Sequence, residues 1–253
     1  MPLLEINRLS KAFGGVMAVE DVSFDVEPGI VYSVIGPNGA GKTTLFNLIT
    51  GVYAPSAGDV HLDGVAVGGL SPHVLASKGM ARTFQNLQVC MNMSAVENVM
   101  VGAHLALDRN LLKGMLRFPA LGRADDEVRA RASELMAYVG LDAFRDAAAD
   151  AMPYGALKRL EIARALAARP RILFLDEPAA GLNPKETAEI DELIRRIADG
   201  GVTVVLVEHD MKLVMNISDR ILVLDHGRKL TEGTAREVRA NPEVIAAYLG
   251  RAA

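Results

Sequence analysis

Cysteine, excess positive charge and long apolar runs are all scarce in this chain of 253 residues. Cys90 is the only cysteine, so no intrachain disulfide can form, as is typical of a protein in a reducing cytosol. The formal net charge of −4 argues against a broad basic surface, and we expect no nucleic-acid partner. No stretch approaches the ~20 uninterrupted apolar residues of a membrane-spanning helix, and the N-terminus shows no secretory signal pattern.

A glycine-rich segment is the most informative part of the sequence. It matches the phosphate-binding pattern G-x-x-x-x-G-K-[ST] at every fixed position and reads Gly36-Pro37-Asn38-Gly39-Ala40-Gly41-Lys42-Thr43-Thr44. Residues 30–35 before it predict a buried strand, and residues 45–49 after it predict a helix. Glycines let successive N–H groups approach a polyphosphate, and the helix N-terminus adds positive potential. We therefore expect Lys42 to reach the β- and γ-phosphates of a nucleotide and the Thr43 hydroxyl to bind Mg²⁺.

Two adjacent acids, Asp176 and Glu177, follow the apolar run 171–175, which predicts a second buried strand. A carboxylate at the C-terminal edge of a sheet lies beside phosphates that are bound by a neighbouring loop. Asp176 is therefore the expected second metal-ordering residue. Glu177 is the expected general base that polarises a water for attack on the γ-phosphate.

Three further side chains stand at positions where they can contact a nucleotide. His209 follows the predicted strand 202–207 and can hydrogen-bond a γ-phosphate. Gln85 also follows a strand, and its amide oxygen either touches Mg²⁺ or the attacking water, or is an ordinary loop amide. Phe13, beside two glycines, either stacks on a nucleotide base or folds onto the sheet.

The predicted secondary structure changes in character twice along the chain. Residues 1–85 and 153–253 mix strands and helices, beginning with an alternating pattern that indicates an antiparallel β subdomain. Residues 86–152 lose the β-branched alternation and contain the helix-capping pattern Ser94-Ala95-Val96-Glu97. We predict a single α/β domain, 1–253, whose catalytic core (1–85 and 153–253) carries an inserted α-helical subdomain at 86–152.

The order of these motifs resembles the nucleotide-binding subunit of ABC transporters over essentially the whole chain. The resemblance implies a P-loop NTPase core, ATP and Mg²⁺ as ligands, and ATP hydrolysis coupled to transport. It implies that Phe13 stacks on the base and that Gln85 and His209 act in catalysis with Glu177. It also identifies residues 36–44 as the Walker A loop, Asp176 as the Walker B acid, and residues 180–183 as the D-loop.

One motif departs from the family pattern. The signature, usually Leu-Ser-Gly-Gly-Gln, stands here as Met152-Pro153-Tyr154-Gly155-Ala156. Pro153 cannot supply the serine hydroxyl that would donate to a γ-phosphate, so this contact is lost. Gly155 at a helix N-terminus still favours phosphate, whereas Tyr154 is expected only to pack.

Within this family, two ATPase chains sandwich two ATP molecules, so the resemblance implies a homodimer or a heterodimer with a sister subunit. It further implies integral-membrane permease subunits, a periplasmic or extracellular substrate-binding protein, and a peripheral location at the cytoplasmic face of the inner membrane. The signature and the chain ending look like the larger ATPase subunit of branched-chain amino-acid importers. Alternatives are the ATPase of a lipopolysaccharide-type exporter, a soluble ABC ATPase not tied to transport, and a nucleotide-binding regulatory module without turnover.

The segment directly after Gln85 contains two methionines, Met91 and Met93, and further apolar side chains. We predict that Val89, Met91 and Met93 line a groove for a helix of the membrane subunit, because methionine adapts to a partner surface. The alternative is that they pack between the two subdomains.

Overall fold

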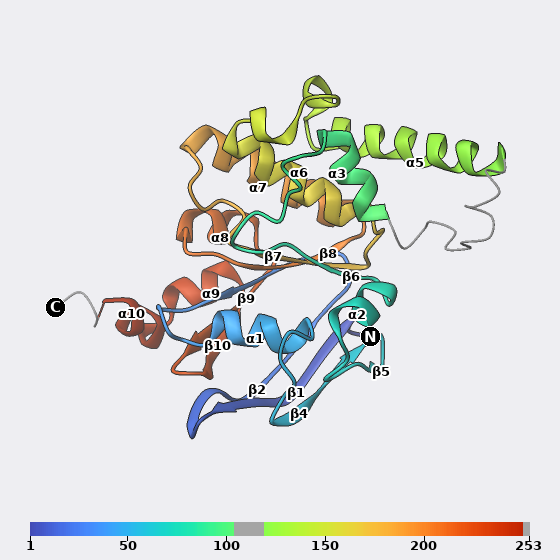
Figure 1. Ribbon diagram of the computed structural model, residues 1–253. Helices are drawn as coiled ribbons and strands as arrows, with labels where there is room; N and C mark the ends of the chain where they lie inside the picture. Colours follow the sequence, from blue (N-terminus) through green and yellow to red (C-terminus); the bar gives the residue numbers. More distant parts are fainter. Residues whose placement is uncertain (104–118, 250–253) are drawn as a thin grey trace. The chain divides into compact units, whose positions relative to one another are not determined.

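The computed structural model describes residues 1–103 and 119–249, and the chain divides into two units (Figure 1). The first unit contains residues 1–82 and 171–253, and the second contains residues 83–170. Both regions that the sequence predicted are present, one that mixes strands and helices and one that is helical. The helix of the signature segment, expected in the core from residue 153, instead clusters with the second unit, because it packs against a helix of that unit, α3 (Ala95–Gly102).

An antiparallel sheet opens the first unit. Its strand order is β2-β1-β4-β5, formed by β2 (Val16–Val26), β1 (Leu4–Phe13), β4 (Ala57–Leu62) and β5 (Val65–Ala66). Leu4 is paired with Val26 on one side and with Leu62 on the other. This sheet is the antiparallel subdomain that the alternating sequence predicted.

A six-stranded sheet of order β10-β9-β3-β8-β7-β6 forms the centre of the first unit. All its neighbouring strands pair in parallel except β9 and β10. The strands β3, β7 and β8 are buried along their whole length, which explains why they read as continuous apolar runs. The strands are β10 (Arg228–Gly233), β9 (Arg220–Asp225), β3 (Val31–Ile35), β8 (Thr203–Val207), β7 (Ile172–Asp176) and β6 (Met80–Arg82).

Helix α1 (Lys42–Ile49) joins the two sheets into one core. Its buried residues belong to the same apolar cluster as Leu9 of the antiparallel sheet and Val205 of the parallel sheet, and Figure 1 shows α1 between the sheets. The Phe46 ring meets Phe174 of β7 edge-on, with ring centroids 5.3 Å apart. This packing fixes the helix that follows the glycine-rich loop.

The remaining helices of the first unit are short or amphipathic. Helix α7 begins with Asn183 as its cap and Pro184 at the first position, and Asn183 and Glu186 form a complete capping box. A smaller apolar cluster joins Ile35 and Val223 of the sheet to Val214 and Val238 of two helices. These helices are α2 (Pro72–Ser77), α7 (Pro184–Asp199), α8 (Met211–Ile217), α9 (Ala235–Ala240) and α10 (Pro242–Leu249).

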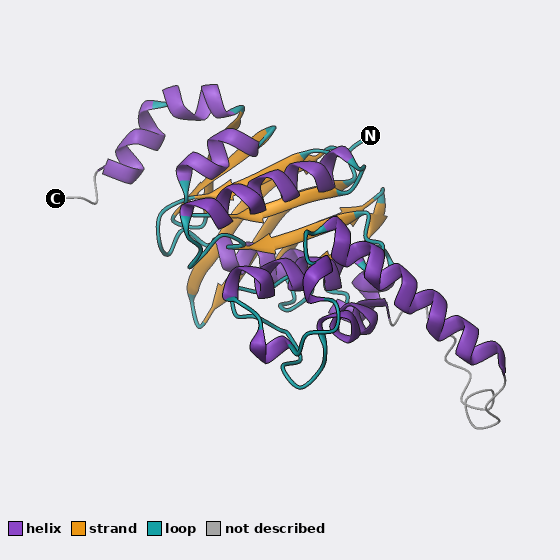
Figure 2. Cartoon of the chain, turned by 90° about the horizontal axis from the view of Figure 1, so that it is seen from above, coloured by secondary structure: helices purple, strands orange, loops and turns teal. Residues whose placement is uncertain are grey.

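The described residues of the second unit form helices and loops without strands, as expected (Figure 2). Its helices are α3, α5 (Pro119–Tyr138) and α6 (Tyr154–Leu166), with single turns at Asp142–Phe144 and Ala149–Ala151. Ser94 and Glu97 form the predicted capping box at the start of α3. No helix among the described residues of either unit is both long and apolar enough to cross a membrane.

Candidate nucleotide-binding site

The glycine-rich loop connects β3 to α1, in the strand-loop-helix order that the sequence predicted. Gly41 caps α1 with φ 97°, a left-handed conformation that glycine adopts without steric cost. A Cβ on Gly36 would lie 2.2 Å from the Leu224 carbonyl oxygen, so no other residue fits there without movement. The loop is therefore a backbone cradle at a helix N-terminus, as phosphate binding requires.

Lys42 is buried at the first position of α1 and turns back over the loop. Its Nζ donates to the Gly36 carbonyl at 2.7 Å and to the Pro37 carbonyl at 3.0 Å. Burial lowers the pKa of the Lys42 ammonium, while the charges of Glu177 and Asp176 act in the opposite direction. The ammonium thus lies in the electrostatic field of both acids that the sequence predicted for this site.

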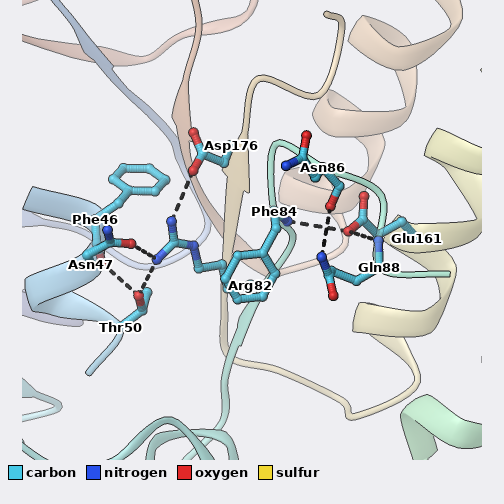
Figure 3. A network of polar contacts seen from close by, with 9 residues as sticks. All are labelled: Phe46, Asn47, Thr50, Arg82, Phe84, Asn86, Gln88, Glu161 and Asp176. Carbon is cyan, nitrogen blue, oxygen red and sulfur yellow. Dashed lines mark hydrogen bonds and ion pairs between the residues drawn. The ribbon is translucent and has the colours of Figure 1, made fainter. Parts of the chain in front are cut away.

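Asp176 ends β7 and is buried, paired in the ladder with Val207 of β8. Its Oδ2 accepts from the guanidinium of Arg82 at 3.0 Å (Figure 3). The sequence predicted Asp176 and not its partner, because Arg82 is 94 positions earlier in the chain and only the β6-β7 pairing brings the two together.

Glu177 and His209 form a direct pair across neighbouring strand ends. The Nε2 atom of His209 lies 2.7 Å from Oε1 of Glu177. The Glu177 backbone is held by its N–H donating to the Val207 carbonyl at 2.9 Å, and its φ is +50°. A non-glycine residue in this left-handed region is uncommon and is concentrated at functional sites. The geometry therefore aims the Glu177 carboxylate at the histidine.

Glu208 is a buried acid that the sequence reasoning did not single out. Its two carboxylate oxygens accept from the backbone N–H groups of Ala179 at 2.8 Å and of His209 at 2.9 Å. Burial raises the pKa of Glu208, and these backbone bonds act in the opposite direction. Glu208 thus ties the segment after Glu177 to the end of β8.

The oxygen donors of the first unit fit a magnesium ion. The Thr43 residue is exposed at the start of α1, and Asp176 stands at the edge of the sheet. No group of three or more His, Cys, Asp or Glu side chains that could hold a metal occurs among residues 1–103 and 119–249. Mg²⁺ is typically held by one or two protein oxygens together with phosphates and water.

Phe13 ends β1 and keeps 43% of its surface exposed. Its ring meets Tyr53 edge-on at a centroid distance of 5.3 Å, and the Lys11 ammonium lies 5.1 Å from the ring centre. One ring face is therefore supported by protein, and the ring is still accessible. Both the stacking role and the packing role predicted for Phe13 are compatible with this placement.

The other predicted site residues, Gly155 and Gln85, lie in the second unit. Gly155 is buried in the first turn of α6, which Pro153 caps without a side-chain hydrogen bond. Tyr154, expected only to pack, is in fact 46% exposed, and the Lys158 ammonium lies 5.8 Å from its ring centre. The first turn of a helix projects some side chains outward, and this one faces solvent and not the core.

Helix α6 also holds the loop that carries Gln85. Lys158 donates to the Gln85 carbonyl at 3.4 Å. The buried Glu161 accepts from the backbone N–H groups of Phe84 at 3.3 Å and Gln88 at 3.4 Å (Figure 3). Burial raises the pKa of Glu161, with these N–H groups opposing the shift. Within the second unit, the loop that carries Gln85 and the helix of the signature segment, α6, are therefore linked by polar contacts.

Comparison with protein families gives two matches. Residues 19–180 match the ABC transporter family, and residues 228–253 match the family described as branched-chain amino acid ATP-binding cassette transporter.

Curated relatives match along nearly the whole chain. The chain is 49% identical over 252 residues to the high-affinity branched-chain amino acid transport ATP-binding protein BraF of Pseudomonas aeruginosa, covering 99% of both chains. It is 46% identical to the protein LivG of Escherichia coli, which has the same description, again with 99% coverage of both.

Solved structures support the fold. An ATP-binding cassette of an ABC transporter in its ADP conformation superposes with a TM-score of 0.86 and 29% identity, covering 99% of this chain and 100% of that one. A dimeric cassette in a post-hydrolysis state, bound to ADP and Pi, gives a TM-score of 0.77 at 26% identity, covering 92% of this chain and 99% of that one. The predicted α/β fold with its antiparallel subdomain is thereby confirmed.

Proposed function

This chain belongs to the ABC transporter family as an ATP-binding protein that hydrolyses ATP to drive transport, and we propose that it powers high-affinity import of branched-chain amino acids. The match of residues 19–180 to the ABC transporter family supports the ATPase activity. Full-length identity of 49% and 46% to ATP-binding proteins of branched-chain amino acid transport supports the substrate class and the direction. The same identity favours an importer over the exporter and the soluble ATPase that the sequence left as alternatives.

The Glu177–His209 pair is the observation that carries the catalytic part of this proposal. The 2.7 Å contact fixes a carboxylate directly after the metal-ordering Asp176. In this arrangement, Glu177 orients the attacking water and takes its proton, while His209 holds the carboxylate and contacts the γ-phosphate. The loop from Gly36 to Thr44 binds the phosphates through its N–H groups, and Lys42 leaves its loop carbonyls to reach them.

Mg²⁺ fits the donor set of the first unit and would be held by Thr43 and Asp176. For Gln85, in the second unit, a role as a further metal ligand is what the family resemblance implies. When bound, it neutralises charge on the β- and γ-phosphate oxygens. The base of ATP stacks on Phe13. Lys42 supplies positive charge beside the same phosphates. The charges of Glu177 and Asp176 favour the charged form of its ammonium.

In this family each ATP is bound between two ATPase chains, so one chain provides only part of each ATP site and needs a partner chain. A second ATPase chain, identical or a sister subunit, places its signature segment with Gly155 over the ATP of the first. Permease subunits and a substrate-binding protein complete an importer, with this chain at the cytoplasmic face of the membrane. The dimeric post-hydrolysis state of the similar cassette supports such pairing.

The test compares wild-type protein with Glu177→Gln, assembled with candidate permease subunits in proteoliposomes. Wild-type hydrolysis is expected to rise when leucine-loaded binding protein is added and not with a sugar-loaded one. Glu177→Gln is expected to bind ATP, dimerise and lose hydrolysis by about 10²-fold or more. The matched control is Glu192→Gln, an exposed acid on α7, which should keep wild-type turnover. Undiminished hydrolysis by Glu177→Gln would refute the assigned base.

A further inference from the structure

Arg82 is the last residue of β6 and ends the first of the two segments that form the first unit. Its side chain is 7% exposed, and that of Asp176 is 6% exposed, so their ion pair is screened from solvent. Burial disfavours the charged form of an arginine, and hydrogen bonds and an ion pair offset that cost. Burial indeed lowers the pKa of the Arg82 guanidinium, while Asp176 acts in the opposite direction.

The guanidinium joins two elements through three acceptors (Figure 3). One terminal nitrogen donates to Oδ1 of Asn47 on α1 and to Oγ1 of Thr50, the C-cap of that helix, each at 2.7 Å. The other donates to Asp176 Oδ2 at 3.0 Å. The Phe46 ring lies against the guanidinium, whose central carbon is 5.8 Å from the ring centre. A planar fork with fixed donor directions makes these contacts together, which a lysine ammonium cannot do.

The positions on α1 connect this network to the metal site. Thr43 and Asn47 follow an i, i+4 spacing, which places them on one face of α1, and Thr50 is the C-cap of that helix. The face that carries Thr43 therefore also carries Asn47, one of the residues that Arg82 binds. Through one guanidinium, the orientation of α1 is tied to the carboxylate at the end of β7.

We propose that Arg82 is a positioning residue for the magnesium site, which sets the placement of the Asp176 carboxylate relative to the Thr43 hydroxyl. Its contact engages Oδ2 of Asp176, and Oδ1 is the oxygen we assign to the metal shell. The proposal rests on the proposed ATPase function, because it assumes that Thr43 and Asp176 order Mg²⁺. It concerns metal binding and leaves the phosphate cradle intact.

The test measures metal affinity apart from turnover. Mn²⁺ serves as the probe in an electron paramagnetic resonance titration of the full chain with a non-hydrolysable ATP analogue. Arg82→Met is expected to weaken Mn²⁺ binding by about 10-fold or more, the effect typical of removing an outer-shell partner. Arg82→Lys, which keeps the charge and loses the fork, is expected to lie between. Nucleotide affinity without metal should change by less than about twofold, because Lys42 and the loop carry it.

Two controls keep the result interpretable. Arg171→Met removes an arginine of the same unit from an exposed pair with Asp63, and it should bind Mn²⁺ as the wild type does. If Arg82→Met does not fold, the double variant Asn47→Ala with Thr50→Val leaves the ion pair in place, and it should still weaken Mn²⁺ binding by several-fold.

Wild-type Mn²⁺ affinity in folded Arg82→Met, or in the double variant, would overturn the proposal. A wild-type protein that binds no ATP analogue at all would instead overturn the proposed function. The two failures are therefore distinguishable in one set of titrations.

Discussion

His209 Nε2 lies 2.7 Å from Glu177 Oε1, although the two residues are 32 positions apart in the chain. The pairing of β7 with β8 in parallel register brings the ends of the two strands to the same edge of the sheet. Glu177 is held there by its backbone bond to Val207, and His209 by the carboxylate of Glu208. The sheet therefore orients both members of the pair.

Replacing His209 by alanine removes the partner that fixes the Glu177 carboxylate. We expect His209→Ala to lower the ATP hydrolysis rate by about 10²-fold, the lower range for a positioned acid-base group. ATP affinity should change by only about threefold, because the phosphate loop and Lys42 supply most of the contacts to the phosphates and only the single γ-phosphate contact of His209 is lost. Steady-state hydrolysis and equilibrium nucleotide binding measure the two quantities. His226→Ala, at an exposed hairpin turn, is the matched control, and equal activity of the two variants would contradict the role of His209.

Asp191 on α7 predicts a pH dependence of stability. Burial, together with the charges of Asp210 and Glu208, raises the pKa of Asp191 from 3.8 to about 6. A raised carboxyl pKa in the folded state means that the folded protein binds more protons than the unfolded chain between these values. Stability is therefore highest below the unfolded pKa and falls as pH rises through the folded one.

Asp191→Asn removes this titration. We expect little change in melting temperature near pH ~4 and an increase of about 2–4 °C near pH ~7.5. This corresponds to on the order of 1 kcal/mol, because partial solvent exposure screens the charge. Thermal denaturation at both pH values measures the difference, with Glu192→Gln on the same helix as the control. An equal shift at both pH values would assign the effect to packing instead of charge.

Pro153 can be replaced by the serine that the family signature carries. A serine cap is worth about 1 kcal/mol to a helix, and losing proline costs about 0.4–1 kcal/mol, so stability should barely change. A hydroxyl bond to a charged phosphate contributes about 1.5–3 kcal/mol. Pro153→Ser should therefore strengthen ATP-induced dimerisation by about tenfold or more.

Sedimentation in a Glu177→Gln background measures this dimerisation, because hydrolysis cannot then reopen the pair. Pro153→Ala is the control, since it removes proline and adds no hydroxyl. If the serine and alanine variants dimerise equally, the predicted hydroxyl contact with ATP in the dimer is wrong.

The segment after Gln85 that contains Met91 and Met93 gives a prediction about assembly. Met91 is 42% exposed, and Met93 and Val89 are partly buried. Replacing Met91 and Met93 by Asp should abolish co-purification with the permease subunits and leave nucleotide binding unchanged, because charges cannot enter an apolar groove. Met17→Asp, on an equally exposed methionine of β2, is the control. Persistent co-purification of the double variant would show that this segment is not the docking surface.

The sequence by itself determined the phosphate loop, the acids after β7 and the alternation of α/β and helical regions. It could do so because these features are local: the spacing of Gly36, Gly41 and Lys42, and an apolar run that ends in Asp176, need no distant partner to be read. The capped starts of α3 and α7 were predictable for the same reason, since Ser94 and Asn183 bind N–H groups within three residues.

Only the tertiary structure decided which side chains from distant strands meet. Arg82 contacts Asp176 because β6 pairs with β7, and Glu208 binds Ala179 because β8 lies beside β7. Helix α6 clusters with the second unit because its packing partner is α3, which the local sequence pattern does not reveal. Strand order and helix packing arise from burial of apolar surface over the whole chain, and no local pattern encodes which distant residues that burial brings together.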